Sequence, residues 1–325
     1  MRHVDVLIVG GGPGGSSCAF GLRRRGIDCL VLDRDTFPRT KLCGGLVTQA
    51  AARALGLLPA DYPHGWLWID RFDFHFRRFT LPLPSPQISI RRCEFDAFLL
   101  ARSAVEVIPH RVRSIERRHG RYVVDGTFSC DVLVGAGGTS CPVHRTFFRD
   151  RSRHERSRQI TALEEEFPHE VRDRRCHFWF FDDGFPGYYW YIPKADGWIN
   201  IGVGALAEPL KAKQDSIWRH FERLVERLRR RGLLAAGERR PGGYTYYLRA
   251  DGPAPARDGI YLVGDAAGLA TVDLGEGIGP AIESGLAAAE AIATGKAYRL
   301  DHIPRRSATN LALDLVRRRW LARRG

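Results

Sequence analysis

The stretch Val4-Asp5-Val6-Leu7-Ile8-Val9, followed directly by Gly10-Gly11-Gly12-Pro13-Gly14-Gly15, decides the fold of this chain. Its first six residues are mostly apolar and β-branched, which predicts a buried strand, and the glycines predict a tight turn after it. Ser16 to Arg25 then predicts a helix that ends at Gly26, and Ile27 to Leu32 predicts a second strand. A strand, a crossover helix and a parallel strand make one βαβ unit.

The glycine spacing Gly10-x-Gly12-x-x-Gly15 within this unit indicates a dinucleotide-binding site. Gly10 allows the tight turn, and Gly12 lets the backbone approach a pyrophosphate. Gly15 lets the helix pack closely against the strand. Because the strand, the turn and the helix all agree with the spacing, this is the strongest signal in the sequence.

The start of the predicted helix and the end of the second strand supply further contacts. The helix N-terminus, around Pro13 and Gly14, offers unpaired N–H groups and a favourable dipole to two phosphates. Asp33 closes the second strand 18 residues after Gly15, where a carboxylate accepts hydrogen bonds from an adenosine ribose. We take Arg34, which follows it, as another candidate contact.

The rest of the chain predicts a second, aromatic region. Phe72, Phe74 and Phe76 alternate with polar residues and predict a half-buried strand. The aromatic, strand-rich stretch 160–247 contains one predicted helix with an apolar face. That face carries Trp218, Phe221, Leu224, Val225 and Leu228.

These patterns predict an α/β fold, α+β overall, with a discontinuous Rossmann-type domain and an inserted, mostly antiparallel β-sheet domain. We assign residues 1–54, 87–155 and 248–300 to the nucleotide-binding domain. Residues 55–86 and 156–247 form the substrate-binding domain, and 301–325 form a basic C-terminal helix.

A second motif decides which dinucleotide binds. Tyr261-Leu262-Val263-Gly264-Asp265-Ala266-Ala267-Gly268 resembles the second FAD fingerprint of the p-hydroxybenzoate hydroxylase-like flavoproteins. The resemblance implies FAD as cofactor, with Gly264 in the turn and Asp265 holding the ribityl chain.

Gly275-Glu276-Gly277-Ile278 follows and opens another predicted helix. The resemblance implies that Gly275, Gly277 and Ile278 contact FAD, with the helix N–H groups facing the flavin N1/C2 edge, where negative charge collects on reduction.

A narrower resemblance lies in three stretches. Lys41-x-Cys43-Gly44-Gly45 is similar to a motif of the geranylgeranyl reductase family, flavoenzymes that saturate isoprenoid double bonds. Tyr188-x-Trp190-x-Ile192-Pro193 resembles that family's Tyr-x-Trp-x-Phe-Pro motif, with Ile at the Phe position. Arg92-x-x-Phe95-Asp96 resembles its stretch that enters the helix beside the flavin.

This resemblance implies a reductase in which reduced flavin delivers hydride from N5 to one alkene carbon while a proton reaches the other. Cys43 is the candidate for positioning or proton delivery, and the alternative is a buried thiol that acts as a small hydrophobe. Tyr188 and Trp190 line the pocket over the flavin, and plain core packing is the alternative. The remaining implied FAD contacts are Arg39, Lys41, Gly44, Arg92 and Gly137.

Two departures and two rival functions stay open. Val272-Asp273 stands where the superfamily has Pro, and Asp273 is either an acid or the cap of a turn. From its length we also expect the chain to lack the extra C-terminal domain of longer reductases, which counts against a long prenyl substrate. The enzymatic rival is a flavin-dependent monooxygenase or halogenase, whose Trp-x-Trp-x-Ile-Pro motif shares the Ile192-Pro193 ending. The other rival is a flavin-binding protein without turnover.

The composition bears on partners and location. The formal net charge is +13, with 45 Arg and 5 Lys, which reflects genomic base composition or favours acidic partners. The sequence shows no nucleic-acid-binding module, and no metal-ligand spacing among its 7 Cys and 11 His, so reduced thiols and a cytoplasmic location are expected. We expect no metal, and an electron donor such as NAD(P)H or ferredoxin.

No apolar run reaches the roughly 18 residues that span a bilayer. The helix predicted over 307–324 is either docked on the protein or in peripheral contact with a membrane.

Overall fold

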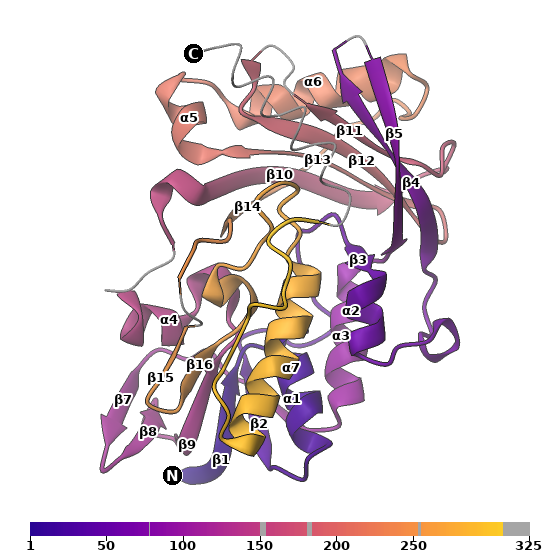
Figure 1. The fold of residues 1–325 in the computed structure, drawn as a ribbon. Coiled ribbons are helices and arrows are strands. Elements are labelled where there is room, and N and C mark those ends of the chain that lie inside the picture. The colour runs from indigo at the N-terminus through magenta and orange to yellow at the C-terminus, as the bar shows by residue number, and fades with distance from the viewer. Residues whose placement is uncertain (78, 150–153, 181–183, 253–254, 308–325) are drawn as a thin grey trace.

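The computed structural model describes residues 1–77, 79–149, 154–180, 184–252 and 255–307, and within them the chain forms two eight-stranded sheets (Figure 1). We call them the nucleotide sheet and the aromatic sheet. The nucleotide sheet has the strand order β15-β16-β9-β1-β2-β6, with β8 beside β9 and β7 beside β8. Its strands are β1 Arg2–Val9, β2 Cys29–Asp33, β6 Glu106–Pro109, β7 Ile115–Arg118, β8 Arg121–Val124, β9 Phe128–Gly135, β15 Ala256–Arg257 and β16 Ile260–Leu262.

Parallel pairing brings three strand ends to one edge of the nucleotide sheet. β1 pairs in parallel with β2 and with β9, so that Val9 lies opposite Leu32 and Gly135. In parallel α/β sheets, ligands bind outside the carboxyl ends of the strands. The glycine turn after β1 and the acid that ends β2 therefore meet at this edge.

Helices cover both the sheet and the edge that binds ligand. The helices are α1 Pro13–Arg23, α2 Gln49–Ala54, α3 Arg92–Ser103, α4 Pro142–Phe147, α5 Ala207–Ala212, α6 Ile217–Arg230 and α7 Ile278–Thr294. Short 3₁₀ turns lie at Pro59–Asp61, Gly138–Ser140, Arg156–Arg158 and Gly264–Ala267. α1 and α7 lie side by side in front of β1 and β2 (Figure 1).

The contact between α1 and α7 depends on glycine. A Cβ on Gly285 would lie 2.2 Å from the carbonyl oxygen of Gly14, and a Cβ on Gly21 would lie 2.7 Å from Cβ of Ala289. Both separations are shorter than van der Waals contact. The two helices can therefore pack this closely only because these positions lack side chains.

The aromatic sheet has the strand order β14-β10-β13-β12-β11-β4-β5-β3. Its pairs are antiparallel except β4 with β11, which run in parallel. α6 packs on one face of this sheet, and the nucleotide-binding part of the chain lies on the other side (Figure 1). The strands are β3 Leu46–Thr48, β4 Leu67–Phe76, β5 Phe79–Ser89, β10 Gln159–Pro168, β11 Cys176–Phe180, β12 Gly187–Lys194, β13 Trp198–Leu206 and β14 Gly242–Tyr247.

The predicted fold class is confirmed, and three details differ from the prediction. From Phe72 to Phe76, β4 is buried on both faces rather than one, because Asp73 and His75 lie under Arg175, His177 and Trp179. Trp218 is 54% exposed, and the buried face of α6 carries His220 in its place. The ring nitrogens of His220 form hydrogen bonds with the Asp215 carboxylate and the Tyr189 hydroxyl group.

The third difference concerns the assigned domain bounds. β3 falls within 1–54 but pairs with β5 of the aromatic sheet, and β5 runs on to Ser89. The chain thus enters the aromatic sheet directly after the Cys43 loop. The helix predicted over 307–324 lies outside the described residues, apart from Ser307. Among the helices that the structure describes, none combines the length and the apolar content that crossing a bilayer requires.

The α1–α7 contact gives a first prediction. Gly285→Ala is expected to lower the free energy of unfolding by about 1–3 kcal/mol, because the methyl group overlaps the backbone of α1. Glu290→Ala, at an exposed position of α7, is the matched control and should change it by less than about 0.5 kcal/mol. Urea unfolding followed by circular dichroism measures both. Equal stabilities would contradict the close packing.

Candidate flavin-binding site

The turn between β1 and α1 is shaped by backbone groups in direct contact. Gly10 has φ +113°, and a Cβ there would lie 2.3 Å from the carbonyl oxygen of Ala136. A Cβ on Gly15 would lie 1.9 Å from the carbonyl oxygen of Gly10. Neither position can accept a side chain, so the first turn of α1 is held against the ends of β1 and β9.

Gly12 differs from its neighbours because it faces open space. A Cβ there would approach only one group within 4 Å, Nη2 of Arg39 at 3.4 Å. Pro13 is the first residue of α1, and its fixed φ suits that position. Gly14 instead packs inward on Val263, whose Cγ2 lies 3.0 Å from an added Cβ. The N-terminus of α1 thus opens beside the Arg39 guanidinium.

Asp33 holds the turn through both carboxylate oxygens. Oδ2 accepts a hydrogen bond from Gly11 N–H at 2.6 Å, and Oδ1 accepts one from Asp35 N–H at 2.9 Å. A carboxylate has about four acceptor sites, so lone pairs are left for ribose hydroxyls. Arg34 points away, because its side chain is 59% exposed and pairs with Asp35.

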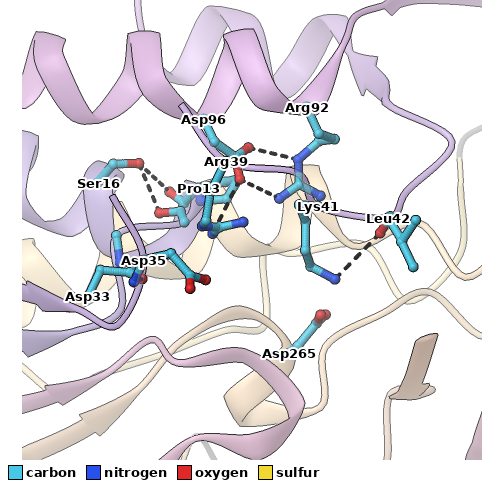
Figure 2. A network of polar contacts seen from close by, with 12 residues as sticks. Pro13, Ser16, Asp33, Asp35, Arg39, Lys41, Leu42, Arg92, Asp96 and Asp265 are labelled. Atoms are coloured by element: carbon cyan, nitrogen blue, oxygen red, sulfur yellow. Dashed lines mark hydrogen bonds and ion pairs between the residues drawn. The ribbon is translucent and has the colours of Figure 1, made fainter. Parts of the chain in front are cut away.

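Two arginines share one buried carboxylate next to this turn (Figure 2). Arg92 donates from Nε and Nη2 to the two oxygens of Asp96 at 2.7 and 2.8 Å, in bidentate geometry. Arg39 Nη2 lies 3.5 Å from Asp96 Oδ2, and the guanidinium stacks on Phe37. Arg39 Nε is buried and has no hydrogen-bond partner in the described part of the chain.

These observations fit an FAD pyrophosphate. An unsatisfied buried donor costs about 1–3 kcal/mol, which a phosphate oxygen at Arg39 would offset. The open position at Gly12 leaves room for the backbone to approach, and the α1 dipole favours negative charge. Arg39, Gly12 and the start of α1 are therefore the residues that would hold it.

The second fingerprint lies across from Lys41 (Figure 2). Asp265 sits in the 3₁₀ turn Gly264–Ala267, and its Oδ2 accepts a hydrogen bond from Tyr244 O–H at 2.5 Å. Lys41 Nζ lies 3.0 Å from the centre of the Tyr244 ring. Burial lowers the pKa of Lys41 to about 8, although Asp265 acts in the opposite direction.

The predicted glycines around Asp265 also come together. Gly264 has φ +57°, and its N–H donates to Ser284 Oγ at 3.0 Å. A Cβ on Gly277, directly before α7, would lie 3.3 Å from Asp265 Oδ1. The N-terminus of α7, where Ile278 is buried, is therefore adjacent to the Asp265 carboxylate.

The other two predicted glycines play different structural parts. Gly275 has φ +64°, and a Cβ there would lie 2.2 Å from the Tyr246 hydroxyl. Gly137 follows β9 and packs on Cys141, whose Cα lies 3.2 Å from an added Cβ. Gly275 is thus in contact with the aromatic sheet, whereas Gly137 lies at the end of the nucleotide sheet.

The loop that carries Cys43 is fixed by a buried lysine. Lys194 Nζ donates to the carbonyl oxygens of Gly44 and Ile90 at 2.7 and 2.8 Å. The Cys43 thiol receives the N–H of Gly45 at 3.5 Å and a hydrogen bond from Arg92. Arg92 is therefore in contact with the thiol.

Tyr188 and Trp190 connect the aromatic sheet to the FAD loops. Tyr188 O–H donates to the carbonyl oxygen of Leu274 at 2.5 Å. Trp190 Nε1 donates to Asn200 Oδ1 at 2.7 Å, and Asn200 Nδ2 donates to the carbonyl oxygen of Cys43 at 3.5 Å. The structure thus brings both aromatic residues of the motif to the Cys43 loop and the loop before α7.

Asp273 makes a long-range contact with Ser307, 34 residues further along the chain. Its carboxylate accepts hydrogen bonds from Ser307 N–H at 3.2 and 3.3 Å. These contacts hold the segment at Ser307 against the loop that replaces the superfamily's Pro, and they do not decide between the two roles left open for Asp273.

Sequence reasoning missed four residues of the site: Glu164, Lys194, Asn200 and Tyr244. Lys194 directly follows the Tyr-x-Trp-x-Ile-Pro motif in a chain with 5 lysines, and this position was a usable signal. Glu164 gave no signal, because Glu164-Glu165-Glu166 reads as a solvated charge run. In the structure, Glu164 is 4% exposed, and its Oε1 has no hydrogen-bond partner among the described residues. Burial raises the pKa of Glu164 to about 7.

The glycine turn, the Asp265 fingerprint and the sheet placed over both define an FAD-dependent oxidoreductase of the p-hydroxybenzoate hydroxylase-like fold. A profile of the FAD binding domain family matches residues 3–52. The chain is 31% identical over 325 residues to the menaquinone reductase of Mycobacterium tuberculosis, covering 88% of this chain and 76% of that protein. It is 25% identical to the digeranylgeranylglycerophospholipid reductase 1 of Methanothermobacter thermautotrophicus, covering 90% and 78%.

A solved structure supports the fold. The geranylgeranyl bacteriochlorophyll reductase-like protein of Thermoplasma acidophilum superposes with a TM-score of 0.77 at 20% identity, covering 90% of this chain and 78% of that one. The chain belongs to the geranylgeranyl reductase family of FAD-dependent oxidoreductases. FAD as cofactor and the oxidoreductase class are confirmed, and the individual site residues stay predictions.

The unpartnered Arg39 donor gives a second prediction. Arg39→Ala is expected to weaken FAD binding about 10- to 100-fold, because it removes a charge-assisted hydrogen bond to the pyrophosphate. Arg118→Ala removes a 60% exposed arginine that pairs with Glu116 and serves as the control. Quenching of flavin fluorescence on titration of the apoprotein measures both affinities. Unchanged affinity in Arg39→Ala would place the pyrophosphate elsewhere.

Glu164 gives a third prediction, on stability. Its folded pKa of about 7 lies above the ordinary 4.5, so the folded protein holds a proton that the unfolded chain releases between these values. Stability therefore falls as pH rises through this window and stays lower above it. Glu164→Gln should raise the free energy of unfolding by about 1–3 kcal/mol at pH about 8 and by little at pH about 4. Urea titrations at both pH values test this difference.

Proposed function

We propose that this protein reduces carbon–carbon double bonds in the isoprenoid chain of a lipid-like substrate. The observation that carries the proposal is the placement of the Cys43 loop. The carbonyl groups of Cys43 and Gly44 accept hydrogen bonds from Asn200 and Lys194 of the aromatic sheet. On the FAD side, the Cys43 thiol contacts Arg92. A substrate chain lying on that sheet would therefore reach the flavin at Cys43.

The face of the aromatic sheet that carries Tyr188 and Trp190 suits an apolar chain. Across β4, β11 and β12 this face is formed by stacked and tilted rings in mutual contact. Its members are Phe72, Phe74, Phe76, Phe178, Phe180, Tyr188 and Trp190. Sites of this composition favour hydrocarbon ligands and exclude water.

Reduced FAD supplies hydride from its N5 when bound. The chain's own part is to hold and orient the reactants. Arg39 and the start of α1 would bind the pyrophosphate, and Asp265 would bind the ribityl chain. The N–H groups that begin α7 would stabilise negative charge at the flavin N1/C2 edge. Tyr188 and Trp190 would press the alkene against the flavin, and Cys43 would orient it.

The relatives support the substrate class by their names, which describe reductases of menaquinone and of a digeranylgeranylated phospholipid. As electron donor we propose NAD(P)H or a ferredoxin. Access to a lipid substrate would be aided by peripheral contact with an anionic membrane, which the net charge of +13 favours. Anaerobic bleaching of the flavin by each donor, and sedimentation with anionic against neutral vesicles, test these two parts.

Flavin reoxidation by an alkene gives a fourth prediction. After anaerobic photoreduction, geranylgeranyl diphosphate or a menaquinone should reoxidise the flavin without oxygen. Cys43→Ala should slow this step about tenfold or more, since the alkene loses its positioning group. Cys93→Ala, the other half-buried cysteine, is the control.

Other outcomes would select the rival functions. A reduced flavin that ignores alkenes but consumes oxygen to form a hydroxylated or halogenated product would establish a monooxygenase or halogenase. A flavin that no donor reduces would identify a binding protein without turnover.

A further inference from the structure

Glu164 stands on the face of the aromatic sheet that meets the FAD loops. It lies in the middle of β10, with Gly202 of β13 and Gly242 of β14 as its register partners. Directly paired residues of antiparallel strands share a face, and so do residues two apart on one strand. Tyr244 of β14 and Tyr188 of β12 therefore share this face with Glu164, and they bond to Asp265 and Leu274.

Side chains of other segments cover the two glycines on either side of Glu164. A Cβ on Gly202 would lie 2.8 Å from Cβ of Glu164 and 2.2 Å from Cζ2 of Trp190. The Trp190 ring thus lies over Gly202, next to Glu164. On the other side, the Leu42 side chain lies over Gly242, where a Cβ would be 2.7 Å from Leu42 Cδ1. Glu164 therefore lies between the Trp190 ring and the Leu42 side chain, on the face of the sheet proposed to hold the alkene.

Several charged and titratable groups face Glu164. Lys41 and Arg92 approach from the FAD side, Lys194 and Tyr188 from β12, and Glu166 from β10 itself. The three cations favour an ionised carboxylate, but burial outweighs them and raises the pKa to about 7. A proton donor works best when its pKa lies near the operating pH, so this carboxyl group is suited to giving up a proton.

Glu164 and Cys43 differ in their hydrogen-bond partners. Glu164 Oε1 has no partner in the described part of the chain, whereas the Cys43 thiol already receives Gly45 N–H and Arg92. An unpartnered buried acid is free to turn toward a substrate. A thiol held as an acceptor is suited to orienting one.

We propose that Glu164 is the proton donor of the reduction, an inference that rests on the proposed function. The π bond of the alkene breaks, one carbon receives hydride from reduced FAD, and the other receives the proton of the Glu164 carboxyl group. Two C–H bonds form, the flavin is oxidised by two electrons, and Glu164 is left as a carboxylate. It regains a proton from water before the next turnover.

The test compares Glu164→Gln with Glu165→Gln, one residue along β10 on the opposite face. Reoxidation of photoreduced flavin by geranylgeranyl diphosphate is followed anaerobically from pH about 5 to 9. The wild-type rate should fall as pH rises through about 7, since the donor must be protonated. Glu164→Gln should be about 100-fold slower or more, with a flat profile, and Glu165→Gln should behave as wild type.

Infrared spectroscopy gives a readout that does not depend on turnover. Burial raises the pKa of Glu276 to about 7 as well, so two protonated carboxyl groups should contribute to the band that titrates near pH 7. This band should keep its full intensity in Glu165→Gln and lose the Glu164 contribution in Glu164→Gln. Glu164→Asp keeps an acid but withdraws it by one methylene, so its rate should be intermediate and its pH dependence retained. This variant also carries the test if the glutamine variant fails to fold.

The two proposals fail in different ways. If Glu164→Gln and Glu164→Asp keep the wild-type rate and pH profile while Cys43→Ala loses activity, the reductase stands and Glu164 is not the donor. A titrating carboxyl band of unchanged intensity in Glu164→Gln would also overturn the assignment. If no isoprenoid alkene reoxidises the wild-type flavin, both the reductase function and the role of Glu164 as proton donor are wrong.

Discussion

Direct contact between backbone groups at the β1–α1 turn is the constraint on which the rest of the site depends. The carbonyl oxygen of Gly10 lies where a side chain on Gly15 would be, and Ala136 lies where one on Gly10 would be. This packing fixes α1 against the strand ends and leaves its N-terminus facing outward at Gly12. α1 then positions α7 through the close contact of Gly14 with Gly285. Because the second FAD fingerprint precedes α7 in the sequence, its position depends on that of the glycine turn.

A few polar contacts join the aromatic sheet to the loops of the candidate flavin-binding site. Lys194 bonds to carbonyl groups of the Cys43 loop and the segment before α3, and Tyr188 bonds to the loop before α7. Buried polar groups are costly unless they are satisfied, which makes such contacts specific as well as stabilising. The aromatic sheet is therefore held in one register over the FAD loops, and a substrate on its rings would meet the cofactor in a defined geometry.

Two groups near the contact between the aromatic sheet and the FAD loops have pKa values shifted toward neutral pH. Burial lowers the pKa of Lys41 to about 8 and raises that of Glu164 to about 7, so both titrate near neutral pH. Clustering of such groups in a cleft is typical of active sites. Lys41 lies on the Cys43 loop and Glu164 on β10 of the aromatic sheet. The two groups therefore come together only when the sheet packs on the FAD loops.

The sequence alone determined the βαβ unit, FAD as cofactor, the fold class and the family, because glycine spacing and strand periodicity are local properties of the chain. It also marked most residues of the candidate flavin-binding site. Tertiary structure alone decided what each residue contacts: Arg92 contacts Cys43, Arg34 is exposed, and β3 joins the aromatic sheet. It also decided that Glu164, one of three consecutive glutamates, is buried. Burial and pairing across 40 to 160 residues of sequence depend on which strands and helices meet, and no local pattern records that.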